Sequence, residues 1–195
     1  VERQAQVALH LLLFLQTCAL GKCSGISIID STPLASCHIK RERQHRTMRG
    51  WAAKGKCTMG WFYGFKLHLV IDDREPLKDK RFTERLFGKL FADRGYISQN
   101  LFEMLFVDNI HLVTKIKKNM KNSLMSLYDK LLLRKRSVIE TVNDELKNVC
   151  QIEHTRHRSF DNFATNLIAG LIAYNLLPKK PEMNIEIIDK SRIIA

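Results

Sequence analysis

The chain has 195 residues, and its 32 lysines and arginines against 20 aspartates and glutamates give a formal charge of +12 at pH 7. A hydrophobic fraction of 45% excludes general disorder, and the length suits one ordinary domain with a core of its own. The excess of positive charge favours a polyanionic partner, either nucleic acid or an anionic membrane surface.

The first predicted element is a helix over residues 5–19. Its apolar run, 7–20, contains His10 and Gln16 and is too short to span a bilayer. A signal peptide is the alternative, because Arg3 precedes the run and small residues follow it. Since the chain does not begin with methionine, we interpret the segment as the last helix of a longer N-terminal region rather than as a membrane element.

The rest of the chain alternates between strand and helix patterns that glycine and proline separate. Strands are predicted at about residues 26–30, 62–71, 89–93 and 111–116. Helices are predicted at about residues 76–87, 98–107, 122–132, 134–149 and 160–176. An irregular basic stretch is expected at 31–58 and a dispensable tail at 182–195. This order of elements indicates a mixed α/β fold.

The five cysteines form no C-x-x-C pair, and an odd number favours reduced thiols over a disulfide framework. A zinc site is not favoured, because its candidate ligands lack the paired spacing of structural zinc sites. These candidates are Cys18, Cys23, Cys37, His38 and His45. The sequence contains neither GxxxxGKS/T nor GxGxxG, so no nucleotide cofactor is expected.

Two predicted strands end in an aspartate: Asp30 follows the apolar run 26–29, and Asp93 follows residues 89–92. A carboxylate at the end of a buried strand is held rigidly yet faces water, so it can bind Mg²⁺ through oxygen. Glu140 lies in an amphipathic stretch that is predicted to be helical. Two strand-end carboxylates and one helix carboxylate can hold two metal ions about 4 Å apart, the arrangement used for in-line displacement at phosphorus.

Four blocks of sequence, taken in this order, resemble bacterial insertion-sequence transposases of the DDE type, most closely the insertion-sequence family numbered nine-eighty-two. The blocks are IDSTP at 29–33, MGWFYGFKLH at 59–68, FADRGY at 91–96 and RKRSVIETVND at 134–144. The resemblance implies a ribonuclease H-like catalytic domain over residues 26–181, with a mixed sheet flanked by helices. It further implies a remnant helix of the N-terminal region at 1–25 and a tail at 182–195.

The resemblance also implies the chemistry. Asp30, Asp93 and Glu140 take the positions of the three catalytic acids, which hold two Mg²⁺ or Mn²⁺ ions. The implied function is metal-dependent cleavage of DNA at the transposon ends, followed by strand transfer into target DNA. The implied partners are DNA and further copies of the chain, with no membrane partner, and the implied location is the bacterial cytoplasm, at the nucleoid.

Many DDE transposases carry Tyr-x₂-Arg-x₃-Glu-x₆-Lys around the third acid. Arg136, Glu140 and Lys147 fit this spacing, whereas Leu133 stands at the tyrosine position. Offsets of four and seven residues return to nearly the same angle of a helix, so the three side chains are expected on one face. Glu140 would then hold metal between cations that bind phosphate. The alternative is a solvated i,i+4 pair worth only a few tenths of a kcal/mol.

Two basic clusters are candidate DNA surfaces, and either one alone could instead be a solvated charge run. Residues 38–58 hold seven lysines and arginines around Trp51, and residues 115–136 hold eight. Residues 154–158 are a weaker third candidate. The predicted DNA-binding residues are Lys40, Arg41, Arg43, Arg46, Lys117, Lys118, Arg136 and Lys147.

The sequence departs from the family after the 62–71 strand. Family members have a further strand and turn there, on the order of 20 residues, where this chain passes directly to a helix. We therefore expect one edge strand to be missing and the 62–71 strand to lie at the edge of the sheet. Asp72 and Asp73 are rival carboxylates, expected in a solvated turn, and His68 is expected to be a partly buried structural histidine.

Two alternatives to a transposase follow from the same features. A ribonuclease H-like nuclease or resolvase would cleave DNA without strand transfer. A non-enzymatic remnant would bind DNA but would not assemble its three acids, because the sheet lacks a strand. A strand-transfer assay separates the first alternative from a transposase, and metal titration of wild type and Asp93→Ala separates the second.

Overall fold

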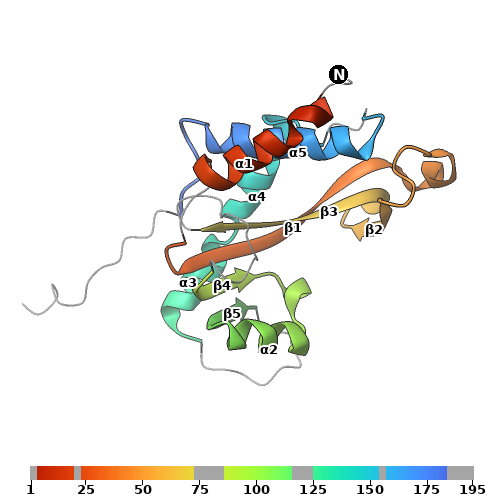
Figure 1. The fold of residues 1–195 in the computed structure, drawn as a ribbon. Coiled ribbons are helices and arrows are strands. Elements are labelled where there is room, and N and C mark those ends of the chain that lie inside the picture. The colour runs from red at the N-terminus through yellow and green to blue at the C-terminus, as the bar shows by residue number, and fades with distance from the viewer. Residues whose placement is uncertain (1–3, 20–22, 73–85, 116–124, 154–156, 184–195) are drawn as a thin grey trace, which may run out of the picture.

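A computed structural model describes residues 4–19, 23–72, 86–115, 125–153 and 157–183 (Figure 1). The strands are β1 (Ile26–His38), β2 (Ala53–Cys57), β3 (Gly60–Asp72), β4 (Gly88–Ala92) and β5 (Ile110–Thr114). The α-helices are α1 (Ala8–Cys18), α2 (Gln99–Val107), α3 (Leu127–Lys135), α4 (Val138–Asn148) and α5 (Phe160–Asn175). Short 3₁₀ helices are η1 (Gln4–Val7), η2 (Ile39–Gln44) and η3 (Arg94–Tyr96).

The five strands form one mixed sheet in the order β2-β3-β1-β4-β5. β3 pairs antiparallel with β1 and with β2, whereas β4 pairs parallel with β1 and with β5. A mixed sheet of this kind, flanked by helices, is compatible with a ribonuclease H-like fold. The predicted α/β class is therefore confirmed.

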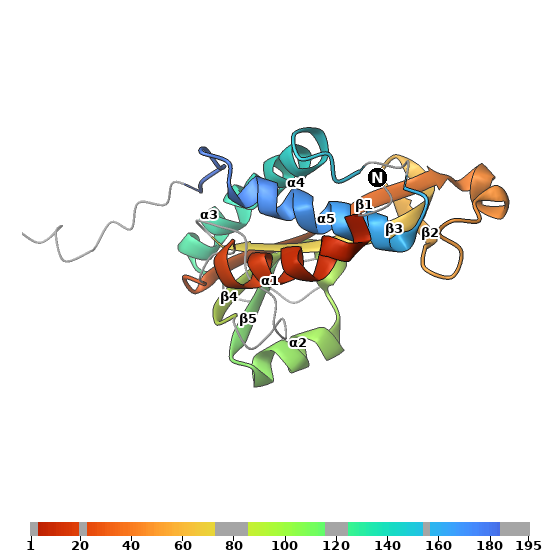
Figure 2. The same cartoon turned by 45° about the horizontal axis from the view of Figure 1, so that its top comes forward.

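Apolar residues divide between the two faces of the sheet. The larger core cluster joins alternate residues of β1, β3 and β4 to α3, α4 and α5, and the smaller one joins the other face to α2. α1 packs against α5 through Leu15, Ala19 and Ile172, and the two helices lie side by side in both views (Figures 1 and 2). None of the described helices is long and apolar enough to cross a bilayer.

β1 is longer than predicted and includes residues expected to be irregular. Thr32 and Leu34 are buried while their neighbours are not, which is the alternation of a strand with one face on the core. Pro33 fits within it because its carbonyl oxygen accepts a hydrogen bond from Lys147 Nζ at 2.8 Å, so its backbone points away from β3. β4 pairs with β1 only as far as Ile29, and proline is tolerated at such an open edge.

The predicted helix at 134–149 is divided between α3 and α4. Arg136 and Ser137 separate them, yet both keep helical dihedral angles, so the chain changes direction without unwinding. The predicted helix at 76–87 lies almost wholly outside the described residues. The tail is described only to Met183, which is buried in the larger core and accepts a hydrogen bond from Lys135, so at least this residue of the tail contributes to packing.

β2 covers only part of the outer edge of β3. It pairs with residues 60–64, and no other strand among the described residues pairs with the remainder of that edge. The expectation that this strand would lie at the sheet edge is thus met beyond Gly64. Unpaired backbone groups along an edge are a route to association between chains.

Gly64 lies where β1 bulges towards β3. The register between the two strands shifts between Ala35 and Cys37, which leaves Ser36 without a partner opposite. A Cβ atom on Gly64 would lie 2.3 Å from the carbonyl oxygen of Leu34 and 2.8 Å from the amide nitrogen of Ser36. Both contacts are with backbone, so they can be relieved only by separating the strands.

We predict that Gly64→Ala destabilises the fold by about 1–3 kcal/mol through overpacking. The measurement is the midpoint of thermal unfolding, which should fall by several degrees. Gly95→Ala is the matched control, because nothing lies within 4 Å of a Cβ at that position. Equal melting temperatures for the two variants would contradict the close approach of β1 and β3 at the bulge.

Asp129 ties the first turn of α3 to β4. Its carboxylate accepts a hydrogen bond from Lys89 Nζ at 2.7 Å, and its backbone amide donates to Ser126 Oγ at 3.0 Å. Burial raises the pKa of the Asp129 carboxyl, but hydrogen bonds from Lys89 and Ser126 outweigh it, so the pKa lies below its usual value of 3.8. Because the pKa is lower in the folded state than in the unfolded state, the carboxylate adds stability at pH values above the unfolded pKa. This stability is lost as the pH falls through the folded pKa.

We predict that Asp129→Asn lowers the melting temperature at pH 7 and loses less stability than wild type when the pH is lowered from 5 to 3. The reason is that the amide has no proton to gain in that range. Thermal unfolding at several pH values measures the effect, with the exposed Asp108→Asn as the control. Parallel curves of melting temperature against pH for wild type and Asp129→Asn would show that the carboxylate is not stabilised by folding.

Candidate active site

Two of the predicted acids follow the last paired residues of β1 and β4. β1 and β4 run parallel, and their pairing ends with Ile29 opposite Ala92. Asp30 is the next residue of β1, and Asp93 is the first residue after β4. Neighbouring strands lie about 4.8 Å apart. The structure therefore brings these two acids together, although Asp30 lies within its strand rather than at its end.

Asp30 points to the face of the sheet that α4 covers. Side chains alternate along a strand, and Ile28, two residues before Asp30, belongs to the larger core cluster. Leu69, which pairs with Asp30, belongs to the same cluster. α4 packs on this face through Ile139, whose side chain is fully buried. The next residue along the helix is Glu140, which is thereby held above the strand that carries Asp30.

The guanidinium of Arg136 lies between Asp30 and Glu140. Its Nη1 is 3.8 Å from Asp30 Oδ1, and its Nη2 is 3.7 Å from Glu140 Oε1. These distances are those of ion pairs and are too long for hydrogen bonds. The Arg136 side chain is 14% exposed and that of Asp30 22%, so this pair is partly shielded from water. A single cation therefore balances two acids that would otherwise repel each other.

Glu140 and Asp93 are the more accessible acids. The Glu140 side chain is 64% exposed and lies in the first turn of α4, where the helix dipole favours a negative charge. Asp93 is exposed, with extended backbone angles of φ −75° and ψ 164°. Its carbonyl oxygen accepts a hydrogen bond from the Tyr96 amide at 3.0 Å, which closes the turn η3.

The three acids suit a metal ion by chemistry more than by their present spacing. Among the described residues, no three histidine, cysteine, aspartate or glutamate side chains lie close enough to form a metal site. An all-oxygen donor set is nonetheless the kind that a hard divalent cation binds. Glu140 and Asp93 are both exposed, so a cation in solution has access to their carboxylates.

A family model described as "Transposase DDE domain" matches residues 20–84 and 71–160, which together span more than half of the chain. This chain belongs to the Transposase DDE domain family. The predicted resemblance to insertion-sequence DDE transposases is confirmed at this level. The family consists of enzymes that act on DNA, generally with divalent metal ions. Comparisons with curated proteins and with solved structures gave no match.

Lys147 of the transposase domain contacts protein groups rather than facing outwards. Its Nζ donates to the Pro33 carbonyl oxygen and lies 3.2 Å from Glu153 Oε2, and its side chain is 20% exposed. It thereby fastens the last turn of α4 to β1. Arg136 lies between α3 and α4, so it does not share one helix with Glu140 and Lys147, although its dihedral angles are helical and its i,i+4 pair with Glu140 forms. Leu133, at the tyrosine position of the family motif, is buried in the core.

The basic residues of the first cluster lie on the surface. Lys40, Arg41 and Arg43 are exposed on η2, and Arg46 is exposed just after it. Trp51 is 63% exposed, and one side of its ring stacks on Phe160 with centroids 4.2 Å apart. Lys117, Lys118 and residues 154–156 lie outside the described part of the chain.

The rival carboxylate Asp72 does not lie in a solvated turn, so that expectation is wrong. It is 4% exposed and pairs with Ser27 in the last register position of β3, three residues before Asp30 along β1. Asp73 lies outside the described residues. The His68 side chain is more exposed than expected, although its ring is partly desolvated. Burial and the nearby Lys66 lower the pKa of His68, more than Asp30 raises it.

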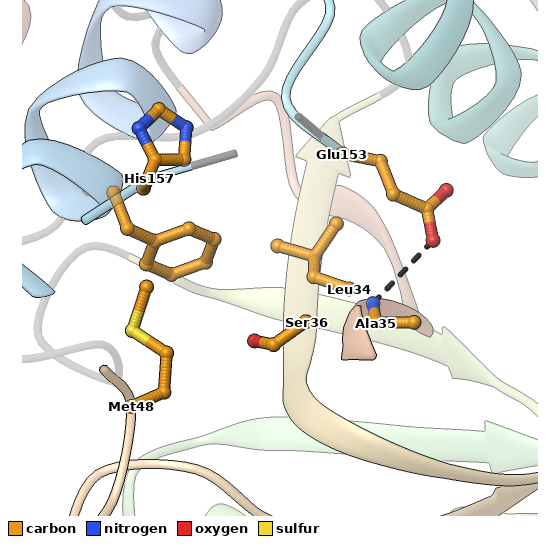
Figure 3. Close-up of a pocket in the computed structure, with 7 residues that line it drawn as sticks. Leu34, Ala35, Ser36, Met48, Glu153 and His157 are labelled. Carbon is orange, nitrogen blue, oxygen red and sulfur yellow. Dashed lines mark hydrogen bonds between the residues drawn. The ribbon is translucent and has the colours of Figure 1, made fainter. Parts of the chain in front are cut away.

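A small hollow lies apart from the acids, between the bulge of β1 and α5 (Figure 3). Its volume of about 10 Å³ holds at most about one water molecule, so it is no ligand site. At its rim the Ala35 amide donates a hydrogen bond to Glu153 Oε1 at 3.4 Å, so this backbone group close to the bulge has a side-chain partner (Figure 3).

All five cysteines are free thiols.

Tyr96 is the residue near the acids that the sequence did not single out. Burial raises the pKa of its hydroxyl, and Asp30, Arg136 and Asp93 are close enough to act on it. The only signal in the sequence is its place in the block FADRGY, at 91–96, which also contains Asp93. Neither spacing nor periodicity indicates that its hydroxyl reaches the strand that carries Asp30.

Proposed function

We propose that this transposase domain cleaves DNA at the ends of an insertion sequence and joins the freed ends to target DNA. Asp30, Asp93 and Glu140 are the catalytic acids. The observation that carries the proposal is the register of β1 and β4, which aligns Asp30 with Asp93 while Arg136 joins Asp30 to Glu140. In the cell we expect it to act on DNA at the bacterial nucleoid, as a homo-oligomer that brings two transposon ends together.

Asp30, Asp93 and Glu140 would hold Mg²⁺ or Mn²⁺, two ions in the complete site. Bound there, such ions activate the attacking oxygen and balance the charge that develops at phosphorus. Asp30 and Asp93 supply rigidity, because both extend from paired strands. Arg136 keeps the acids from repelling each other in the free protein. Arginine binds phosphate oxygens well, so in the complex Arg136 is placed to contact the DNA backbone.

The reaction needs no covalent bond to the protein. In cleavage, a water oxygen attacks phosphorus in line, the P–O3′ bond breaks, and the 3′-oxygen leaves with a proton as a hydroxyl. In strand transfer, that hydroxyl attacks a phosphorus of the target DNA, and a target 3′-hydroxyl leaves in turn. One set of acids serves both steps, since each is a displacement at phosphorus.

The non-enzymatic remnant is the second candidate, and two observations favour it. Beyond Gly64, the described residues give the outer edge of β3 no strand neighbour. The family match consists of two stretches that overlap at residues 71–84, which supports a difference in length from the family at the point where family members have a further strand. A nuclease without strand transfer differs from a transposase only in the second step, so a strand-transfer assay separates those two.

We predict that Asp30→Ala, Asp93→Ala and Glu140→Ala each reduce Mg²⁺-dependent cleavage by about 10³-fold or more, because metal stabilisation is worth several kcal/mol of the barrier. DNA binding should remain, since these acids do not bind phosphate. Cleavage of labelled transposon ends and a binding assay on the same samples measure the two effects.

Asp72→Asn is the control for the acids, because Asp72 is a carboxylate of the same sheet at a different register position. It should cleave like wild type once its folding has been checked. Normal cleavage by Asp93→Ala together with loss in Asp72→Asn would show that the second acid is assigned wrongly. A wild-type protein that binds DNA but never cleaves would favour the remnant.

We predict that replacing Lys40, Arg41 and Arg43 together by glutamine makes the slope of log DNA affinity against log salt less steep by about 2–3 units. The reason is that each phosphate that is no longer neutralised reduces the slope by about one unit. The measurement is DNA affinity from low to moderate salt. Exchanging lysine for arginine and arginine for lysine at the same three positions keeps the charge and is the control. An unchanged slope in the glutamine variant would remove this cluster from the DNA surface.

A further inference from the structure

Tyr96 ends the turn that begins at Asp93. The backbone of this turn is closed by the hydrogen bond from the Tyr96 amide to the Asp93 carbonyl oxygen, at 3.0 Å. The Tyr96 ring is half-buried and packs against the smaller core cluster, the one that lies under α2. The position of Asp93 therefore depends on a short turn whose far end is a packed aromatic side chain.

The Tyr96 hydroxyl reaches across the sheet to two other strands. It lies 2.9 Å from Nδ1 of His68, and the two rings meet edge to face with centroids 5.8 Å apart. The Ser31 side chain lies close enough to this hydroxyl to lower its pKa. Ser31 and His68 lie opposite each other in the β1–β3 pairing. The hydrogen bond to His68 thus joins the turn after β4 to β3, opposite Ser31 of β1 and one register step beyond Asp30.

This contact is on the rear of the acid site. Asp30 and its partner Leu69 face the larger core and α4. Side chains alternate along a strand, so Ser31 and His68 face the other side, where Tyr96 packs. The Tyr96 hydroxyl is therefore placed to hold the backbone that carries the acids from the face opposite Asp30.

We propose that Tyr96 and His68 form a clasp that fixes Asp93 relative to Asp30, which makes both of them positioning residues for the acid site. The inference rests on the proposed function of the two aspartates. Asp93 is exposed, and its carboxylate does not cap η3, so among the described residues it is the turn that sets its place. Groups that bind one ion need placement to within about 0.5 Å, which a loose turn does not give.

Tyr96→Phe in the full chain tests the clasp, because it removes the hydroxyl and keeps the ring. Amide hydrogen exchange of residues 96 and 97 in metal-free protein should become about five-fold faster, as expected when one net hydrogen bond is removed. Affinity for Mn²⁺, followed by calorimetry, should fall by about 10-fold, as when partners that orient metal ligands are removed. The melting temperature and DNA affinity should stay close to wild type.

Tyr128→Phe is the matched control, because it makes the same change on α3, where Tyr128 is 39% exposed. It should leave exchange and Mn²⁺ affinity unchanged. His68→Phe should reproduce the Tyr96→Phe effects, and the double variant should add little to either, because both remove the same hydrogen bond. Additive effects in the double variant would show that the two residues do not act as one clasp.

Asp93→Ala separates failure of the clasp from failure of the proposed function. If Asp93→Ala loses Mn²⁺ affinity while Tyr96→Phe binds like wild type, the acids hold metal and the clasp is wrong. If Asp93→Ala binds Mn²⁺ like wild type, the proposed role of the acid is wrong, and the clasp has nothing to position. Weaker binding in both variants, with faster exchange in Tyr96→Phe, supports both.

Discussion

The parallel pairing of β1 with β4 is the constraint on which the rest of the site depends. The two strands come together where Gly25 and Gly88 meet, with the Lys89 amide donating to the Gly25 carbonyl oxygen at 2.9 Å. Gly88 has φ +81°, and a Cβ there would lie 2.3 Å from the Gly25 carbonyl oxygen, so no other residue fits. This meeting point sets the register, and five residues later Asp30 and Asp93 follow the last pair, Ile29 and Ala92.

α4 adds the third acid by packing and not by polar contact. Ile139, Val142 and Leu146 are at most 2% exposed and fix the rotation of the helix on the sheet. The 3.7 Å contact of Glu140 with Arg136 is weak by comparison, because the carboxylate is largely hydrated. Apolar burial therefore decides where the backbone of Glu140 lies, and the ion pair with Arg136 only biases the direction of its side chain.

The sequence was sufficient for the fold class and for most helices, because those follow from local periodicity. The three acids rest on a motif and stay a prediction. The sequence failed where an element depends on distant partners. β1 continues through Pro33 because Lys147, far along the chain, donates a hydrogen bond to the Pro33 carbonyl oxygen, and no local pattern shows this. Asp72 is buried by its pairing with β1. Tyr96 shows its importance only when three strands are placed side by side.

The junction between α3 and α4 has an evolutionary consequence. α3 is tied to β4 through Asp129, and α4 is tied to β1 through Lys147. The two residues between the helices therefore connect one helix attached to β4 with another attached to β1. Arg136 lies in this junction, and Glu140 lies one turn beyond it. A change that loosens either helix also moves the acid site. Under the proposed function, selection for folding and selection for activity therefore act on the same few positions.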